Sequence, residues 1–291
     1  MSAEPSHPYE ILDVFTDTPL AGNPLAVFTE GEEIPSRLMQ AAARELHLSE
    51  TVFLMPAQEG YDAGLRIFTP GTELPFAGHP TLGAAFVVAQ RLGLSTVRLM
   101  TGAGLVPVRL SSEHGELVHG EMEQPHPRLI SLERPQPLLD ALGVRRAELP
   151  VELYVNGPQH VMVALESADA VAQLDPDAGA LSAAGRALGL TELTVSCFAK
   201  LADGEVKTRV FCPGVGVPED PATGSAAGPL ALHLARHGWC EFGQTLTITQ
   251  GVELQRRSTL LARADGSAHA LERIVVGGSA VRVARGHFRL Q

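Results

Sequence analysis

Three side chains of this sequence could take up and return protons: Glu50, His79 and Asp220. A reaction that moves a proton between two carbon atoms needs one group to remove the proton and another to return it. His79 is the only side chain of its turn that titrates near neutral pH, and Pro221 holds the backbone of Asp220 extended. Taken singly, Glu50 is more simply a solvated charge at a helix–strand junction, and Asp220 part of an Asp-Pro turn. Their chemistry therefore depends on what surrounds them.

His79 and Asp220 lie in two copies of one segment. The copies are RIFTPGTELPFAGHPTLGAA at residues 66–85 and RVFCPGVGVPEDPATGSAAG at residues 209–228. Each begins with Arg, a β-branched residue and Phe, continues through Pro-Gly with a further Pro four residues later, and ends in small residues around a Thr. The duplication predicts two similar strand–turn–helix halves that face each other. The polar residues that differ between the copies then matter most, and they are His79, Glu219, Asp220 and Ser225.

Both copies predict a helix that starts with small residues. The helices that follow, Pro80–Leu92 and Ala226–His237, are apolar nearly all round, which is typical of buried helices. A buried helix start presents unpaired N–H groups and the positive end of the helix dipole. Gly78-His79 and Thr223-Gly224-Ser225 would let an anion approach the backbone. One such start alone is more often an ordinary turn, but two facing starts could hold a carboxylated metabolite.

The remaining pattern predicts further strands and one more helix in the first half. The expected helix runs from Pro35-Ser36 to about His47, with Ser36 as its N-cap. The helix at Pro80, whose proline takes the first helical position, should stop at Gly93. The expected strands of the first half are Ile11–Phe15, Leu25–Phe28, Thr51–Leu54 and Gly64–Phe68.

The chain is expected to form two domains joined by a Pro-rich linker at residues 123–137. The second domain contains the strand Thr208–Cys212 before its buried helix, which Gly238 closes. Two terminal strands, Arg273–Val276 and Ala280–Ala284, flank Gly277-Gly278, and a terminal strand can pair back with the first half. The predicted domains are therefore residues 1–124 plus 275–291, and residues 125–274.

Composition narrows the class of protein. The 291 residues carry a formal net charge of −11 with a pI of about 5.4, which argues against nucleic acid or an anionic membrane as partner. Three scattered cysteines indicate a reducing compartment and not a disulfide framework. The N-terminal residues MSAEPSHPYE do not resemble a signal peptide, and no apolar run has the length of a membrane span. A cytoplasmic location is expected.

Other catalytic constellations are less well supported. Ser225, His79 and Asp220 are the residue types of a hydrolase triad. The segment TGSAA at residues 223–227, however, lacks the G-x-S-x-G pattern that surrounds such a serine. His233 and His237 are four residues apart on a helix and could face one metal ion. The segment HLARH lacks the glutamate of the metalloprotease signature, and His237 is more simply a complement to the helix dipole.

The motifs together resemble one protein family. The segments DVFTDTPLAGNPLAVF, LSETVFL and the two copies above, in this order, are similar to the phenazine-biosynthesis PhzF-like family, a relative of diaminopimelate epimerase and proline racemase. The resemblance extends over nearly the whole chain, down to the terminal VVGGSAVRVARG. It implies an α+β, diaminopimelate epimerase-like fold, in which two pseudo-symmetric halves each wrap a curved, barrel-like sheet around a central helix. It also implies an active site in the cleft between the halves, a homodimer, and no metal or organic cofactor.

The resemblance also assigns roles to residues. The family's best-understood activity is the isomerisation of trans-2,3-dihydro-3-hydroxyanthranilate, in which a glutamate moves a proton between carbons. Glu50, in the segment SET, matches that glutamate, and His79, Asp220 and Ser225 match the assisting residues. The backbone at Gly78, Gly224 and Ser225 matches the positions that bind the substrate carboxylate, and Asn23 in AGNP is a weaker candidate for the pocket. The cysteine pair of the related racemases is missing at both helix starts, so a two-thiol mechanism is not expected.

The leading hypothesis is therefore a cofactor-independent isomerase that moves a carbon-bound proton in a small carboxylated metabolite. Glu50 would be the base and then the acid, while His79 and Asp220 would orient the substrate or relay protons. Two alternatives remain open at this point. One is a hydrolase or lyase that uses the same cleft, and the other is a dimeric metabolite-binding protein without catalysis.

Overall fold

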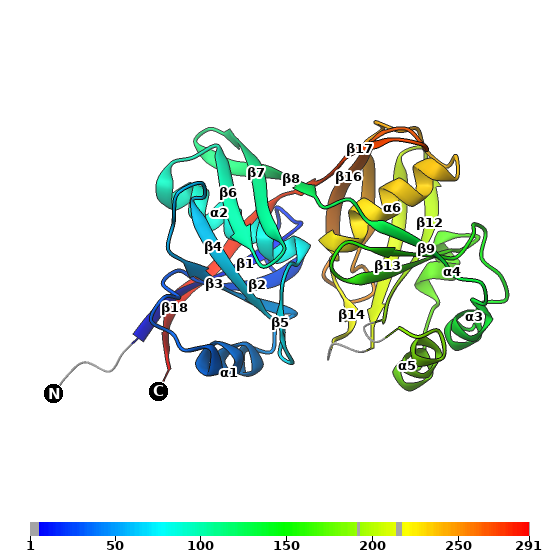
Figure 1. Ribbon diagram of the computed structural model, residues 1–291, viewed down its shortest axis with the longest axis horizontal. Helices are drawn as coiled ribbons and strands as arrows, with labels where there is room; N and C mark the ends of the chain where they lie inside the picture. The colour runs from blue at the N-terminus through cyan, green and yellow to red at the C-terminus, as the bar shows by residue number, and fades with distance from the viewer. Residues whose placement is uncertain (1–5, 191–192, 214–216, 291) are drawn as a thin grey trace. The chain divides into compact units, whose positions relative to one another are not determined.

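The computed structural model describes residues 6–190, 193–213 and 217–290. The chain divides into two compact units (Figure 1). Unit 1 consists of residues 1–123 and 277–291, and unit 2 of residues 124–276. Residues 1–5, which belong to the segment that lacks a signal-peptide pattern, lie outside the described ranges. None of the helices in those ranges combines the length and the apolar character that crossing a bilayer requires.

Unit 1 is a curved sheet around one helix. The central helix, α2, contacts strands all along the curved sheet, namely β1, β2, β3, β4, β6, β7 and β18. The helix α1 packs on β3 and β4. Figure 1 shows α2 in cyan with the strands of this unit around it. The helices are α1 (Ser36–Leu46) and α2 (Gly78–Leu92). The strands are β1 (Ser6–Val14), β2 (Asn23–Phe28), β3 (Glu50–Met55), β4 (Ala63–Phe68), β5 (Glu73–Leu74), β6 (Thr96–Thr101), β7 (Gly104–Glu113), β8 (Glu116–Gln124) and β18 (Ala280–Arg289).

Unit 2 repeats this plan around α6. The α6 helix contacts β11 and β16, while α4 packs on β12 and β13, and α3 packs on α5. The helices are α3 (Gln136–Leu142), α4 (Ala168–Ala172), α5 (Ala178–Ala187) and α6 (Gly224–Arg236). The strands are β9 (Arg128–Ser131), β10 (Glu152–Val155), β11 (Gln159–Ala164), β12 (Leu193–Ala202), β13 (Glu205–Cys212), β14 (Val217–Asp220), β15 (Leu246–Gln250), β16 (Ser258–Gly266) and β17 (Leu271–Gly278).

The strand pairings of the two units match. In unit 1, β2 runs parallel to β3, β3 antiparallel to β4, and β4 parallel to β6 across the helix α2. In unit 2, β11 runs parallel to β12, β12 antiparallel to β13, and β13 parallel to β15 across α6. Parallel neighbours need a crossover connection, which the helices supply. The duplication seen in two 20-residue segments therefore extends to the order of strands and helices in each unit.

Each central helix is buried nearly all round, as its composition predicts. Twelve consecutive residues of α2, from Gly78 to Ala89, are buried, and so are twelve of α6, from Gly224 to Ala235. Gly93 ends α2 in the left-handed conformation that favours glycine, as expected. The helix α2 begins at Gly78, two residues before the expected start, and Pro80 occupies the third helical position, where its missing N–H group still costs no hydrogen bond. The helix α6 begins at Gly224, within the expected opening at Thr223-Gly224-Ser225.

One expectation about local structure is wrong. Pro35, and not Ser36, is the N-cap of α1, and no side chain caps this helix. The Ser36 hydroxyl instead accepts a hydrogen bond from Arg66 Nη1 at 2.9 Å. The expected linker at residues 123–137 contains the boundary between the two units, and it also contains β9, which pairs with β10. Charged and Pro-rich residues tolerate an exposed strand as well as a loop, so composition did not distinguish them.

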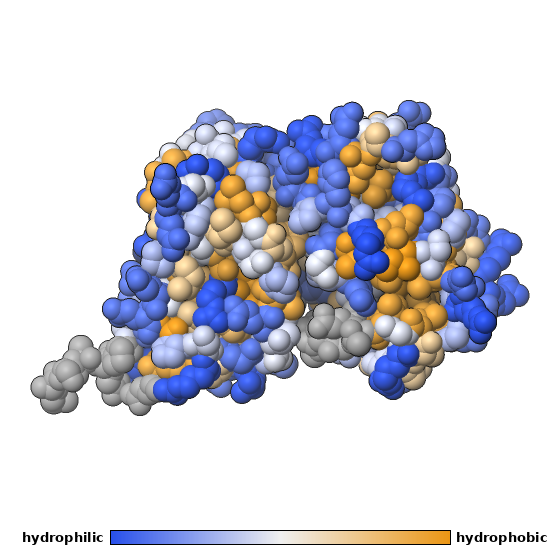
Figure 2. Space-filling view, in the orientation of Figure 1, coloured by the Kyte–Doolittle hydropathy of each residue, from blue (hydrophilic) through white to orange (hydrophobic). Residues whose placement is uncertain are grey.

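The last strand of the chain returns to the first. β18, in red, pairs along β1, in blue, in Figure 1, and the antiparallel register joins Ser6 to Arg289 and Val14 to Ala280. This agrees with the expectation that a terminal strand pairs back with the first half. On the face drawn in Figure 2, hydrophilic residues cover much of each unit, and apolar residues are scattered among them.

Both copies of the duplicated segment contain an arginine held between a phenylalanine and a glutamate. Arg66 lies 5.1 Å from the ring centre of Phe68, and its Nη2 contacts Glu73 Oε2 at 2.6 Å. In unit 2, Arg209 lies 5.0 Å from the ring centre of Phe211, and its Nη2 contacts Glu219 Oε2 at 2.7 Å. These ion pairs fix the turn that leads from each strand toward its central helix.

Candidate active site

Three of the predicted residues meet in unit 1. Asn23 Nδ2 lies 3.3 Å from His79 Nδ1, and Glu50 Oε2 lies 3.4 Å from the same ring nitrogen. Asn23 is completely buried, His79 is 3% exposed, and the Glu50 side chain is 16% exposed. The weaker candidate, Asn23, is therefore in direct contact with a stronger one, His79.

The topology of unit 1 explains why these side chains meet. Asn23 is the first residue of β2 and Glu50 the first residue of β3. The two strands run parallel, with Leu25 opposite Glu50, so their first residues lie at the same edge of the sheet. His79 is the second residue of α2, which packs on both strands. Three segments distant in sequence thus deliver one polar side chain each to the start of the helix.

His79 is a neutral imidazole at physiological pH. Burial removes the water that would stabilise the charged ring, which lowers the pKa of His79 to about 3. The distance to Glu50 is within ion-pair range, but desolvation outweighs that neighbour, so the contact is not an ion pair. When Asn23 Nδ2 donates to Nδ1, the ring proton is on Nε2, which has no hydrogen-bond partner within the described ranges. The contact between Nδ1 and the Glu50 carboxyl can hold one proton, on either group.

The buried histidines should make the protein sensitive to mild acid. His79 and His160 are both buried with the pKa lowered to about 3, so the folded state stays unprotonated while the unfolded state binds protons below about pH 6.5. The unfolded state therefore holds more protons, and the free energy of unfolding falls as the pH falls from 6.5 toward 3. Each histidine should contribute about 1.4 kcal/mol per pH unit between pH 6 and 5.

Urea denaturation at pH 7, 6 and 5 would measure this dependence. His160→Gln should reduce the slope of the unfolding free energy against pH by the contribution of one histidine, about 1.4 kcal/mol per pH unit. His79→Gln should reduce it by the same amount. The exposed His269 is the matched control, and replacing it with Gln should leave the slope unchanged. Equal slopes in the wild type and in both buried-histidine variants would contradict the prediction.

In unit 2, amide side chains organise the start of α6. Pro229 lies inside the helix and has no N–H group, so the carbonyl oxygen of Ser225 loses its usual helical donor. The side chain of Asn156 replaces that donor, with Nδ2 2.9 Å from the Ser225 oxygen. Gln124 Nε2 donates to the carbonyl oxygen of Gly224 at 2.8 Å. The first carbonyl groups of the helix are thus occupied, while the first N–H groups face the helix start.

Asp220 belongs to a hydrogen-bonded turn before α6. Its Oδ2 accepts a hydrogen bond from Thr223 Oγ1 at 2.7 Å, and its backbone carbonyl accepts one from Gln250 Nε2 at 2.7 Å. The Gln250 side chain also accepts from the backbone N–H of Thr223 at 3.1 Å. Asp220 is 9% exposed and Gln250 is 2% exposed. Asp220 is therefore held by its own turn and not only by the proline that follows it, Pro221.

Sequence reasoning missed the three amide side chains that build this turn. Gln124, Asn156 and Gln250 are all at most 5% exposed, although their residue type favours the surface. One signal was present, because Pro229 inside a predicted helix implies a carbonyl group that needs another donor. Nothing in the sequence indicates which amide supplies it.

The predicted site residues thus form two groups, each described within its own unit. Asn23, Glu50, Gly78 and His79 lie together in unit 1, with Gly78 as the first residue of α2. Asp220, Gly224 and Ser225 lie together in unit 2, where Gly224 and Ser225 are the first two residues of α6. Both helix starts are buried and built from small residues, as expected.

The sequence matches the family model of phenazine biosynthesis-like proteins, PhzC-PhzF, over residues 12–286. It is 45% identical over 280 residues to a protein of Pseudomonas fluorescens named trans-2,3-dihydro-3-hydroxyanthranilate isomerase, with 96% of this chain and 98% of the relative covered. A protein of Pseudomonas aeruginosa with the same name is 44% identical, at the same coverage. The alternatives of a hydrolase, a lyase or a non-catalytic binding protein gain no support from these relatives.

Solved structures of epimerases share the fold of this chain. The chain is similar to a predicted epimerase from Pseudomonas aeruginosa, with a TM-score of 0.84, 29% identity, and coverage of 98% of this chain and 100% of the other. A hydroxyproline epimerase from Agrobacterium vitis shares the fold with a TM-score of 0.67 at 14% identity, over 97% of this chain and 91% of the other. The α+β, epimerase-like fold class and the isomerase class expected from the sequence are confirmed. With its family model matched over nearly its whole length, the chain belongs to the phenazine biosynthesis-like, or PhzC-PhzF, family.

Proposed function

We propose that this isomerase moves a carbon-bound proton within a small carboxylated metabolite, with Glu50 as the group that carries the proton. The first candidate substrate is trans-2,3-dihydro-3-hydroxyanthranilate, because two relatives with at least 44% identity are named for its isomerisation. The observation that carries the proposal is the contact of Glu50 with a neutral, buried His79.

The proposed reaction starts with the ionised Glu50 carboxylate. It removes a proton from one carbon of the substrate, and the electron pair left behind shifts along the conjugated system. The carboxylic acid then returns the proton at another carbon, so that the atoms and charges of the substrate balance and Glu50 is regenerated. One residue can act first as base and then as acid when both its protonation states have a partner.

His79 supplies such a partner in both states. Its Nδ1 atom, 3.4 Å from Glu50 Oε2, can accept a hydrogen bond from the neutral carboxyl group. In the other tautomer the same nitrogen carries the proton and can donate to the carboxylate. A ring with a pKa near 3 makes this change without becoming charged. Asn23, which contacts the same nitrogen at 3.3 Å, has both a donor and an acceptor on its amide and can follow either tautomer.

The substrate carboxylate is proposed to bind to helix N-termini. Backbone N–H groups at Gly78, Gly224 and Ser225 have the helix-dipole environment that favours an anion. The occupied carbonyl groups of Gly224 and Ser225 support this role, because Gln124 and Asn156 hold the peptide planes in one orientation. Asp220 is proposed to orient a polar group of the same substrate, from a turn that Thr223 and Gln250 fix.

The proposal is tested by proton NMR in D₂O. The purified protein is mixed with trans-2,3-dihydro-3-hydroxyanthranilate, and in parallel with a panel of small amino and hydroxy acids. We expect isomerisation of one compound, with deuterium entering at the carbon that receives the proton. A sample without protein is the control. Neither isomerisation nor carbon-bound deuterium in any compound would contradict the proposal.

A cytoplasmic location and a homodimer belong to the same proposal. The location is supported by three cysteines that are all free within the described ranges, two of them buried. The homodimer is supported by family membership. Light scattering of the NMR sample would give its mass in solution, and a mass of one chain would contradict the dimer.

A further inference from the structure

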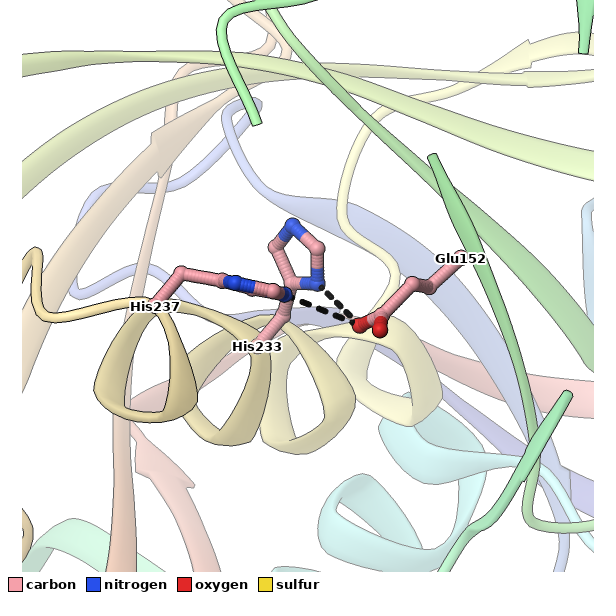
Figure 3. Close-up of side chains that lie close together, drawn as sticks. All are labelled: Glu152, His233 and His237. Carbon is pink, nitrogen blue, oxygen red and sulfur yellow. Dashed lines mark hydrogen bonds and ion pairs between the residues drawn. The ribbon is translucent and has the colours of Figure 1, made fainter. Parts of the chain in front are cut away.

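A second cluster of titratable side chains lies in unit 2, at the end of α6 away from Gly224. Glu152, the first residue of β10, points toward His233 on α6 and toward His237, the C-cap of that helix, as Figure 3 shows. Glu152 Oε2 lies 3.1 Å from His233 Nδ1 and 3.1 Å from His237 Nε2. The three ligand-type atoms all lie within 4.8 Å of one another. The proposed isomerase chemistry uses none of these groups.

The cluster already holds one positive charge. Arg236 Nη1 contacts the same Glu152 oxygen at 2.8 Å, and the Tyr154 hydroxyl donates to it at 2.8 Å. His233 and His237 contact that oxygen as well, each at 3.1 Å. Four groups thus converge on one carboxylate oxygen, and one of them, the Arg236 guanidinium, is a cation that a metal ion would displace.

We propose that Glu152, His233 and His237 form a binding site for a divalent transition-metal ion of the zinc type, in which the metal replaces the Arg236 guanidinium as the cation. Two imidazole nitrogens and a carboxylate oxygen are a ligand set typical of zinc, with bonds of about 2.0–2.2 Å. Such bonds place the ligand atoms about 3.3 Å apart in a tetrahedron. The two observed distances of 3.1 Å are already close to that value.

The ligand side chains are held in position before a metal arrives, and each ring nitrogen that donates to Glu152 becomes a ligand when its proton shifts to the other nitrogen of the same ring. The pair His233 and His237 lies one turn apart on α6, so both rings leave the same face of the helix. The ring of His233 is completely buried and packs edge-on against Tyr154 and Phe198, at centroid distances of 5.7 and 5.8 Å. Nitrogen ligands favour zinc, copper or nickel over magnesium and calcium, which prefer oxygen.

The site has an entrance and a place for a fourth ligand. The side chain of His237 is 19% exposed and that of Arg236 is 26% exposed, whereas Glu152 is 9% exposed. A metal can therefore enter from solvent as the guanidinium swings outward, and water can complete the tetrahedron. The position in the last turn of α6 adds the negative end of the helix dipole. A bound metal would tie β10 to the end of α6 and so stabilise unit 2.

The test uses untagged, chelator-treated protein and Zn²⁺ or Co²⁺ alone. Calorimetry should find one Zn²⁺ per chain, Co²⁺ should develop the visible absorption of a four-coordinate site, and Zn²⁺ should raise the melting temperature. His237→Gln should weaken Zn²⁺ binding at least tenfold, since even outer partners of metal ligands act on that scale. Arg236→Gln, which keeps all three ligands, should tighten binding by about tenfold because the competing charge is gone.

The exposed residue His269 provides the matched control, and the His269→Gln variant should bind Zn²⁺ as the wild type does. Circular dichroism would show that each variant is folded. Failure to bind Zn²⁺ in both the wild type and folded Arg236→Gln would overturn the proposal. Binding that survives unchanged in His237→Gln would overturn it as well, because the ion would then occupy another place. Neither readout depends on the isomerase reaction, so this inference and the proposed function can fail separately.

Discussion

Replacing Glu50 by Gln is expected to reduce turnover by at least about a thousandfold while substrate still binds, which acid–base catalysis by one positioned group readily accounts for. Glutamine has nearly the same shape as glutamate, and its amide can still contact His79, which lies 3.4 Å from the carboxyl oxygen in the wild type. It cannot remove a proton from carbon. The expected loss is therefore in kcat and not in binding.

Binding and turnover can be measured separately for this variant. Calorimetry with unreacted substrate is possible because Glu50→Gln does not convert it, and NMR follows any slow conversion in the same buffer. Glu45→Gln, an exposed change on α1, is the matched control and should retain wild-type activity. A Glu50→Gln enzyme that turns over within tenfold of the wild type would remove Glu50 from the proposed mechanism.

The second large effect concerns stability. Arg209→Met is expected to lower the free energy of unfolding of unit 2 by about 3–5 kcal/mol, the usual cost of breaking a buried ion pair from one side. Glu219 is 11% exposed and would keep its charge without the two hydrogen bonds from Arg209, at 2.7 and 2.9 Å. The carbonyl oxygens of Ala172 and Val171, to which Arg209 Nη1 donates, would lose that donor too.

The duplication supplies a matched control for this variant. Arg66 makes the equivalent contacts with Phe68 and Glu73, but its side chain is 27% exposed and that of Glu73 is 43% exposed. Arg66→Met should therefore cost about 1 kcal/mol or less, the range of solvent-exposed pairs. The single tryptophan, Trp239, lies in unit 2, so its fluorescence in a urea titration reports on that unit. Circular dichroism would measure the loss of unfolding free energy for both variants. Equal losses would contradict the conclusion that the Arg209–Glu219 pair is the more stabilising of the two.

The central helices and their apolar faces could be predicted because they depend on local pattern. A run such as Leu82–Ala89 is apolar at every position, and a duplicated Pro-Gly turn leads into each helix. The contact between Asn23 and His79 could not be predicted in this way, since the two residues are 56 positions apart. Only the family resemblance linked them, with Asn23 as a weaker candidate for the pocket.

Interactions between distant segments also explain what the duplicated sequences concealed. Glu73 and Glu219 have the same role toward their arginines, yet Glu73 is seven residues from Arg66 and Glu219 is ten residues from Arg209. Aligned residue by residue, the copies do not place these glutamates together. Likewise, Gln250 serves a turn 27 residues earlier, at Thr223, and no local pattern connects them.

The pairing of β1 with β18 has a consequence for how the chain is made. Residues 6–14 are synthesised well before their partners at residues 280–289. At about 5–20 residues per second, a ribosome separates the two events by on the order of tens of seconds. Unit 2 is contained entirely within that interval and can fold first. Meanwhile one edge of β1 stays open to other nascent chains. Unit 1 is therefore completed after unit 2, and a chain that stops before residue 280 would leave β1 without this partner.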